Sequence, residues 1–259
     1  MIMKEKILVL DIETAPNWDV IHTLYPVPTP PVFDPYTVKV GTYKAGNPKI
    51  QEKIDAAALA HETSLLTWED DHWAEIVEKR KVLLNPTLGC VHAVGWRWVG
   101  EEKTHIHMAP ELTEADLIQS LALAIQECDV CIGFNLKQFD LPFLALRARV
   151  RGISWPNLMK GRYYKDHIVD MMEVLCSNTR NMVSLKCSAV AFGFPKCPDD
   201  TSGKEFWKET NAVTQREYLT WDVEATAYLA TYYEDVVSRA LAGHPPIPDW
   251  TKEELGVIQ

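Results

Sequence analysis

No apolar run in the 259 residues approaches the ~18 residues that span a membrane. The start of the chain has charged residues within its first apolar stretch and no small-residue cleavage site, so we expect no signal peptide. The chain also lacks internal repeats and low-complexity blocks. Its six cysteines are irregularly spaced, which favours reduced thiols over a disulfide framework. These absences indicate an intracellular globular protein.

Positive charge is scarce overall but is concentrated in one stretch. The formal net charge is −10, from 26 Lys and Arg against 36 Asp and Glu, which argues against broad nonspecific binding to polyanions. Residues 137–186, however, contain nine basic and four acidic side chains. A solvated helix face with a loop explains this excess as well as a binding surface does, so charge alone does not decide.

The pattern of apolar residues predicts a mixed α/β sheet with helices on its faces, because strands and helices alternate after an early antiparallel meander. Expected strands are 6–14, 90–98, 103–108, 130–134 and 167–170, and expected helices are 50–84, 113–127, 139–151, 182–192 and 213–240.

One domain is expected over 1–243, followed by a C-terminal tail over 244–259. Residues 15–88 are expected to form a largely helical insertion between the first and second strands. The Pro-rich segment 26–35 within it favours a stiff surface loop, and a loop that covers substrate or docks a partner is the alternative. The nine tryptophans, Trp155 among them, are expected to pack in the core and the insertion.

Two acids end the first expected strand. Asp11 and Glu13 are two residues apart, so their side chains share one face of the strand. Like charges placed this closely repel unless a cation or a hydrogen-bond donor compensates. The alternative is a pair of strand-end side chains that face water.

Two further acidic positions follow later in the chain. Asp140 comes after the strand expected at 130–134, where it can also serve as a helix N-terminal acid. Tyr218 and Asp222 are four residues apart on an expected helix, and therefore lie on the same face. An aromatic side chain in the core beside a solvated acid would explain that last pair equally well.

Taken together, these places supply four carboxylates and one phenol. Hard divalent cations such as Mg²⁺ prefer oxygen ligands. Two such ions can hold the attacking and leaving oxygens of a phosphoryl displacement. The set is therefore suited to metal-assisted cleavage of a phosphodiester.

The order Asp-x-Glu, Asn-x-x-x-Phe-Asp and Tyr-x-x-x-Asp resembles the three motifs of the DEDD superfamily of 3′→5′ exonucleases. The tyrosine four residues before the last Asp is typical of the DEDDy variant. Similarity is greatest to the proofreading exonuclease domain of family-B DNA polymerases and its stand-alone relatives, and it extends over about 6–235. The resemblance implies a ribonuclease-H-like fold.

The resemblance also implies roles for individual residues. Asp11 would bridge two Mg²⁺ or Mn²⁺ ions, Glu13 and Asp222 would complete the site of the nucleophilic water, and Asp140 would hold the second ion. Tyr218 would orient the water. Thr14, Ala15, Asn135 and Phe139 would bind the substrate strand.

The expected activity is hydrolysis of single-stranded DNA from its 3′ end to nucleoside 5′-monophosphates, with the basic stretch following the strand. Two alternatives stay open: a 3′→5′ exoribonuclease, and a non-catalytic nucleic-acid-binding module of a replication complex. A chain of this length leaves no room for a polymerase, so proofreading would serve a DNA polymerase in trans. We expect a cytoplasmic location, in a bacterial cytosol or a phage-infected host.

Overall fold

A computed structural model describes residues 5–25, 27, 29–39, 47–160, 163–176, 183–197 and 203–243. Two compact units are present, one formed by Met1–Pro16 with Leu83–Gln259 and the other by Asn17–Val82. The tail expected over 244–259 lies outside the described residues, as do Pro26 and Pro28 of the Pro-rich segment. Within the described part, no helix is both long and apolar enough to cross a membrane.

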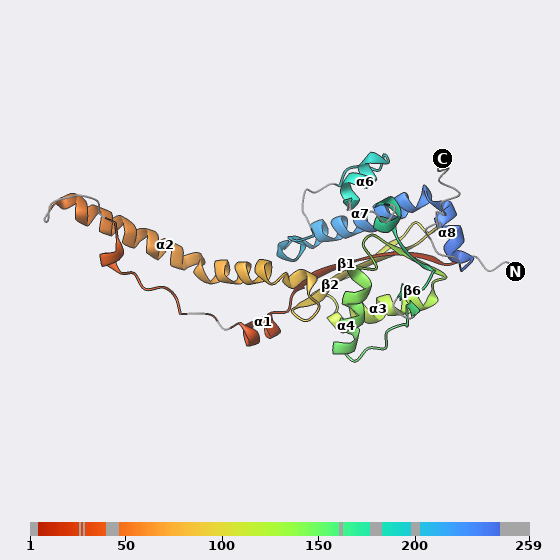
Figure 1. Cartoon of the computed structure of the whole chain (residues 1–259), viewed down its shortest axis with the longest axis horizontal. Coiled ribbons are helices and arrows are strands. Elements are labelled where there is room, and N and C mark those ends of the chain that lie inside the picture. The colour runs from red at the N-terminus through yellow and green to blue at the C-terminus, as the bar shows by residue number, and fades with distance from the viewer. Residues whose placement is uncertain are drawn as a thin grey trace, which may run out of the picture. The chain divides into compact units, whose positions relative to one another are not determined.

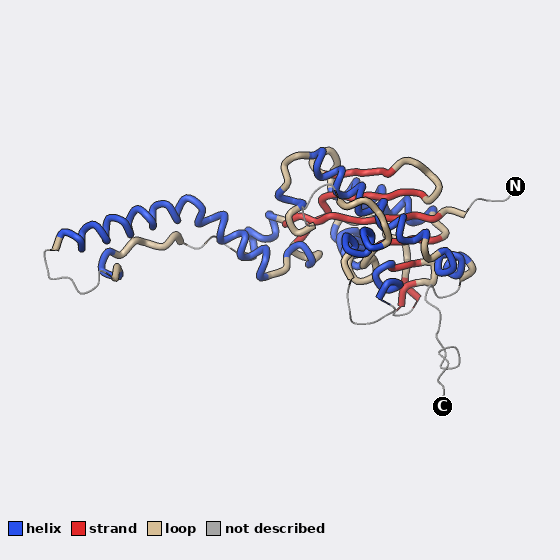
Figure 2. Tube along the Cα trace, turned by 90° about the horizontal axis from the view of Figure 1, so that it is seen from above, coloured by secondary structure: helices blue, strands red, loops and turns tan. Residues whose placement is uncertain are grey.

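The first unit is built on a five-stranded sheet in the order β3-β2-β1-β4-β7 (Figure 2). Its strands are β1 (Ile7–Pro16), β2 (Gly89–Trp98), β3 (Thr104–Met108), β4 (Val130–Gly133) and β7 (Ile168–Asp170). β2 pairs antiparallel with β1 and with β3, whereas β4 pairs parallel with β1 and with β7. The predicted mixed sheet with an early antiparallel meander is confirmed.

Helices cover both faces of this sheet (Figure 1). Alternate residues of β1 point to opposite sides, so Leu8, Leu10 and Ile12 join the apolar cluster formed with α3 (Glu114–Glu127) and α4 (Asp140–Val150). Val9 joins the cluster on the other side, which contains α7 (Ala212–Thr231). The face of β1 that bears Asp11 and Glu13 is therefore the face covered by α7.

Gly95 lets α7 approach the sheet closely. It pairs with Asp11 across β1 and β2. A Cβ atom at this position would lie 2.9 Å from Cγ of Leu219 and 3.0 Å from Cγ2 of Val223, both on α7. A larger residue would push the helix away from the strand at the level of the acids.

The C-terminal helix differs from the prediction. Instead of one helix over 213–240, the chain forms α7 and then α8 (Glu234–Leu241). Tyr233, between them, leaves the helical conformation with φ −127° and ψ 43°. The hydroxyl of Tyr232 donates to the carbonyl of Phe192 at 3.2 Å, and the two rings are in contact. Tertiary contacts thus fix the break, and no Gly or Pro marks it in the sequence.

Four short elements of this unit were absent from the prediction. α5 (Met171–Cys176) follows β7 directly, and β5 (Met159–Lys160) pairs with β6 (Tyr163–Tyr164) in a separate two-stranded sheet. The helix expected over 182–192 is the shorter α6 (Leu185–Ala191), and a 3₁₀ turn, η3 (Phe206–Lys208), precedes α7.

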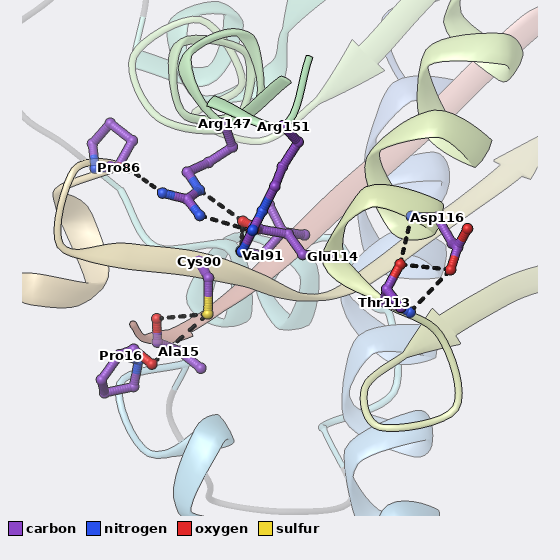
Figure 3. A network of polar contacts seen from close by, with 10 residues as sticks. All are labelled: Ala15, Pro16, Pro86, Cys90, Val91, Thr113, Glu114, Asp116, Arg147 and Arg151. Atoms are coloured by element: carbon purple, nitrogen blue, oxygen red, sulfur yellow. Dashed lines mark hydrogen bonds and ion pairs between the residues drawn. The ribbon is translucent and has the colours of Figure 1, made fainter. Parts of the chain in front are cut away.

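A buried ion pair joins β2, α3 and α4 (Figure 3). Arg147 on α4 donates from Nε and Nη2 to the two carboxylate oxygens of Glu114, each at 2.7 Å. Glu114 also accepts from the backbone amide of Val91 on β2 at 2.9 Å and from Nε of Arg151 at 2.6 Å. Nη1 of Arg147 donates to the carbonyl of Pro86 at 3.2 Å. This network anchors the turn that leads into β2.

The second unit is mainly helical. It contains α1 (Trp18–Leu24), the 3₁₀ turn η1 (Pro35–Thr37) and α2 (Pro48–Lys79), and the 3₁₀ turn η2 (Val82–Leu84) begins at its end. The rings of Trp18 and His22 on α1 contact Trp73 on α2, with centroids 6.1 Å and 4.6 Å away. Farther along, Phe33 contacts His61. The helical content expected of this region is present.

Candidate active site

Three carboxylates converge where β1 faces α7. One side-chain oxygen each from Asp11, Glu13 and Asp222 lies within 4.8 Å of the others. Glu13 and Asp222 are buried, with 8% and 7% of their surfaces exposed. Asp11 and Glu13 share a face because they are two apart on the strand, and α7 brings Asp222 to that face. An oxygen-only set of this kind fits a hard divalent cation such as Mg²⁺ or Mn²⁺.

Asp140 approaches the same region from the edge of β1 that pairs with β4. β4 pairs with β1 only as far as Val9. Beyond that point, Oδ1 of Asp140 accepts a hydrogen bond from the backbone amide of Ile12 at 3.2 Å. Asp140 is 2% exposed and begins α4. It is not among the three acids with mutually close oxygens, yet its charge acts on Asp11 and Glu13.

Burial raises the pKa values of all four acids, and repulsion from neighbouring carboxylates adds to the rise for Asp11, Glu13 and Asp140. The pKa of Asp11 and that of Glu13 rise well above their ordinary values, first through burial and then through the neighbouring carboxylates. Burial likewise raises the pKa of Asp140 to about 8 and that of Asp222 to about 7. Ionising the whole set therefore requires compensating positive charge.

Tyr218 lies beside these acids on α7. Its hydroxyl donates a hydrogen bond to the carboxylate of Asp222, one helical turn away, and this bond opposes the rise in the pKa of Asp222. Burial and the charges of Asp222, Glu13 and Asp11 raise the pKa of Tyr218 far above its usual value. The phenol is therefore a neutral hydrogen-bonding group at physiological pH.

Two residues close to the acids, Lys186 and Gly203, were not among the site residues predicted from the sequence. Nζ of Lys186 on α6 lies 5.0 Å from the centroid of the Tyr218 ring, and its charge lowers the pKa values of Glu13 and Asp222. The chain at Gly203 also passes close by, since a Cβ atom there would lie 3.4 Å from Oε2 of Glu13 and 3.6 Å from the Tyr218 hydroxyl. The sequence signal for Lys186 was its place in the basic stretch, whereas Gly203 had none.

Asn135 precedes Asp140 in a loop held by Asp170. Asp170 accepts hydrogen bonds from the backbone amides of Asn135 at 2.9 Å, Lys137 at 3.0 Å and Met172 at 3.0 Å. Asn135 adopts a left-handed φ of 62°, which asparagine tolerates better than most residues. Its Oδ1 atom is buried and has no hydrogen-bond partner within the described part of the chain. That acceptor is therefore available to a ligand.

The remaining candidate substrate residues lie on either side of the acids. Thr14 and Ala15 continue β1, pairing with Val91 and Cys90, after an irregularity between Glu13 and Thr14. The Thr14 hydroxyl donates to the carbonyl of Leu83 at 2.8 Å, so its oxygen can serve a substrate only as an acceptor. Phe139 is half-buried immediately before Asp140.

Comparisons with known proteins agree with this architecture. The family model for the exonuclease domain of DNA polymerase family B matches residues 97–192. No curated protein sequence matches the chain. Among solved structures, the family B DNA polymerase of the hyperthermophilic archaeon Pyrobaculum calidifontis is similar in fold, with a TM-score of 0.54 and 14% sequence identity. The match covers 94% of this chain and 26% of the polymerase, so this chain spans about a quarter of that protein.

The family-model match includes Asn135 and Asp140, whereas β1 and α7 lie outside the matched residues. At 14% identity the structural match bears on fold alone. The chain accordingly has a ribonuclease-H-like α/β fold, and its resemblance to a proofreading-type exonuclease of the DEDD superfamily is confirmed.

Proposed function

We propose that the protein is a metal-dependent 3′→5′ exonuclease that removes nucleoside 5′-monophosphates from single-stranded DNA. The observation that carries this proposal is the convergence of Asp11, Glu13 and Asp222 within 4.8 Å, beside Tyr218. The family B exonuclease-domain match supports nuclease activity and a nucleic-acid substrate.

The buried acids fit the two Mg²⁺ or Mn²⁺ ions that a two-metal mechanism requires. Burial raises the pKa values of these acids, so a bound cation would favour their ionised forms, and every candidate ligand atom is a carboxylate oxygen. Asp11, Glu13 and Asp222 would hold one ion, with Asp11 shared, and Asp140 would help to hold the second. When bound, the ions supply Lewis acidity and lower the pKa of a water molecule.

The chain's own groups then orient the reactants. A water molecule beside Asp222 would donate a hydrogen bond to the Tyr218 hydroxyl oxygen, since the phenol stays protonated and already donates its own hydrogen to Asp222. Lys186 lowers the pKa values of Glu13 and Asp222, and therefore keeps both carboxylates ionised at lower pH. The buried Oδ1 of Asn135 offers an acceptor to the terminal nucleotide.

A digest of end-labelled oligonucleotides tests the proposal. With Mg²⁺ or Mn²⁺, 5′-labelled single-stranded DNA should give a descending ladder, whereas 3′-labelled DNA should release labelled mononucleotide at once. EDTA should stop both reactions. Matched RNA should be a poorer substrate, and faster cleavage of RNA would reassign the enzyme as an exoribonuclease.

Two variants on α7 complete this experiment. Asp222→Asn should lower the rate by about 100-fold or more, because it removes a charged ligand. Glu217→Gln removes an exposed charge from the same helix and should leave the rate unchanged. Equal rates for the two variants, or binding of DNA without cleavage by the wild type, would contradict the proposal, and the latter would favour a non-catalytic binding module.

A proofreading role would place the protein beside a separate DNA polymerase. Such a role calls for a physical association, which a pull-down of host polymerase on the purified chain would detect. Failure to recover a polymerase would count against proofreading and would leave the nuclease proposal intact.

A further inference from the structure

A pocket of about 450 Å³ opens on the flank of α4, outside the group of acids. Its volume is within the range of ~300–1,000 Å³ that is usual for small-molecule sites. It is lined by one face of α4, by the loop that leads to β5 and by Tyr164 of β6. The lining residues used below are Leu141, Arg149, Trp155, Asn157 and Tyr164.

The pocket combines flat aromatic surface with hydrogen-bonding groups. Trp155 and Tyr164 are half-buried, so each keeps part of its ring accessible, and Arg149 is exposed at the rim. Oδ1 of Asn157 accepts from the backbone amide of Met159 at 3.2 Å, which holds the side-chain amide in place. Aromatic faces and guanidinium planes stack on nucleobases, and amides bond to their edges.

The same helix links this pocket to the acids. Leu141, at the pocket wall, directly follows Asp140. Phe139, Trp155 and Tyr164 all pack against the apolar cluster beneath α4. Burial raises the pKa of Tyr164, and so do the charges of Asp140 and Asp170. Tyr164 is therefore near enough to sense these carboxylates while it lines the pocket.

Nothing in the proposed chemistry uses this pocket. α4 packs into the core through Leu141 and through Leu144, Arg147 and Ala148, all of which are buried, whereas Arg149 stays exposed. Arg149 adds positive charge at the rim, and it belongs to the basic stretch 137–186. Positive charge beside a stacking surface complements a single strand, whose phosphates and bases alternate.

We propose that this pocket binds one base of the substrate strand, upstream of the nucleotide held at the acids. Trp155 and Tyr164 supply the stacking surface, Asn157 contacts the base edge and Arg149 contacts the adjoining phosphate. Trp155 then binds substrate in addition to packing against the apolar cluster, the role expected from the sequence. This inference rests on the proposed function for its assignment of strand direction.

A length series of oligothymidylates, from two to ten nucleotides, tests the proposal. Dissociation constants are measured by fluorescence anisotropy in EDTA, and KM and kcat are measured with Mg²⁺. For the wild type, affinity should increase stepwise at the length that first reaches the pocket. Trp155→Ala should abolish that step, raise Kd for the ten-nucleotide strand about tenfold and leave kcat unchanged.

Two further variants guard against misfolding and nonspecific loss. Trp155→Phe keeps an aromatic ring and should restore most of the affinity. Trp68→Ala removes a tryptophan from α2 in the other unit and should have no effect. Superimposable length series for wild type and Trp155→Ala would overturn the inference, as would a loss of affinity that is equal at every length.

Free thymidine monophosphate is tested last, as a competitor for binding of the ten-nucleotide strand. One outcome is that the free nucleotide competes as strongly as the ten-nucleotide strand and loses this effect in Trp155→Ala. That result would make the pocket a nucleotide site and overturn the assignment to a strand. The binding assay also separates the two proposals. A wild type that shows the affinity step without cleavage would refute the nuclease, whereas one that cleaves without the step would refute the pocket alone.

Discussion

At the scale of single residues, the hydrogen bond from Tyr218 to Asp222 has a measurable consequence. The bond opposes the rise in the pKa of Asp222, so Tyr218→Phe should raise that pKa further. We expect kcat to fall by about 10- to 100-fold, because the water loses an orienting group. The rising limb of the kcat–pH profile should also move to higher pH. Metal binding by isothermal calorimetry should persist, and an unchanged rate would remove Tyr218 from the mechanism.

Lys186 gives a second prediction at this scale. Its charge lowers the pKa values of Glu13 and Asp222. Lys186→Met keeps a side chain of similar size but removes the charge. It should therefore shift the rising limb of the kcat–pH profile to higher pH and reduce activity most at low pH. Lys196→Met, a change to another lysine of this unit, is the control. If the kcat–pH profiles of both variants and the wild type have their rising limbs at the same pH, Lys186 has no electrostatic role.

Sequence patterns locate residues whose relation is local. Asp11 and Glu13 share a strand face, and Tyr218 and Asp222 share a helix face, so spacing alone pairs them. The structure brings Asp11, Glu13 and Asp222 together, with Asp140 near them. Lys186 reaches them only because α6 packs on α7, and no spacing rule encodes that contact.

At the scale of elements, the Glu114–Arg147 pair is a buried polar connection between α3 and α4. Glu114→Gln would leave the buried guanidinium of Arg147 without its counter-charge, and we expect a loss of about 3–5 kcal/mol in the free energy of unfolding. Urea denaturation measures this change. The exposed pair Arg216–Glu111 provides the control, since Glu111→Gln should leave stability nearly unchanged. Similar midpoints for both variants would contradict the anchoring role of the network.

Elements with a strong periodic signal and clear ends were predicted well, and the exceptions have physical causes. α3 begins after Thr113, whose capping box with Asp116 can be read directly from the sequence. β5 and β6 have two residues each, which is too short for any periodicity. The break between α7 and α8 depends on contacts of Tyr232 with Phe192, which are distant in the chain.

At the scale of the whole molecule, the stability of the metal-free protein should fall as the pH rises. The folded-state pKa values of Asp140 and Asp222, about 8 and about 7, lie above their unfolded values. Between the two sets of values the folded state binds more protons than the unfolded state, so unfolding becomes easier as the pH increases. Each such group contributes about 1.4 kcal/mol per pH unit in that window. In EDTA, Tm should therefore decrease from pH 5 to pH 8.

Mn²⁺ should remove most of this pH dependence, because bound cations stabilise the ionised acids. Asp140→Asn should raise Tm at pH 8 in EDTA, and Asp116→Asn, outside the site, should not. A Tm that rises with pH in EDTA would show that positively charged groups of the protein already compensate these acids.

The second unit is expected to be dispensable for the fold of the first. β1 ends at Pro16 and β2 begins at Gly89, and these two residues face each other in the sheet. Replacing Trp18–Lys81 with a linker of about four Gly and Ser residues should preserve cooperative unfolding and cleavage of short oligonucleotides. An insoluble or non-cooperative product would show instead that Asn17–Val82 belongs to the same folding unit.

The acids that meet beside β1 are contributed by distant parts of the chain: Asp11 comes from the first strand, and Asp222 from a helix near the end of the described sequence. During synthesis on a ribosome, the N-terminal strand emerges long before α7. A nascent chain that stops short of α7 can form much of the sheet, yet it lacks Tyr218 and Asp222. Nuclease activity would thus be withheld until α7 has been synthesised, and fragments that terminate before α7 would be harmless to nucleic acid.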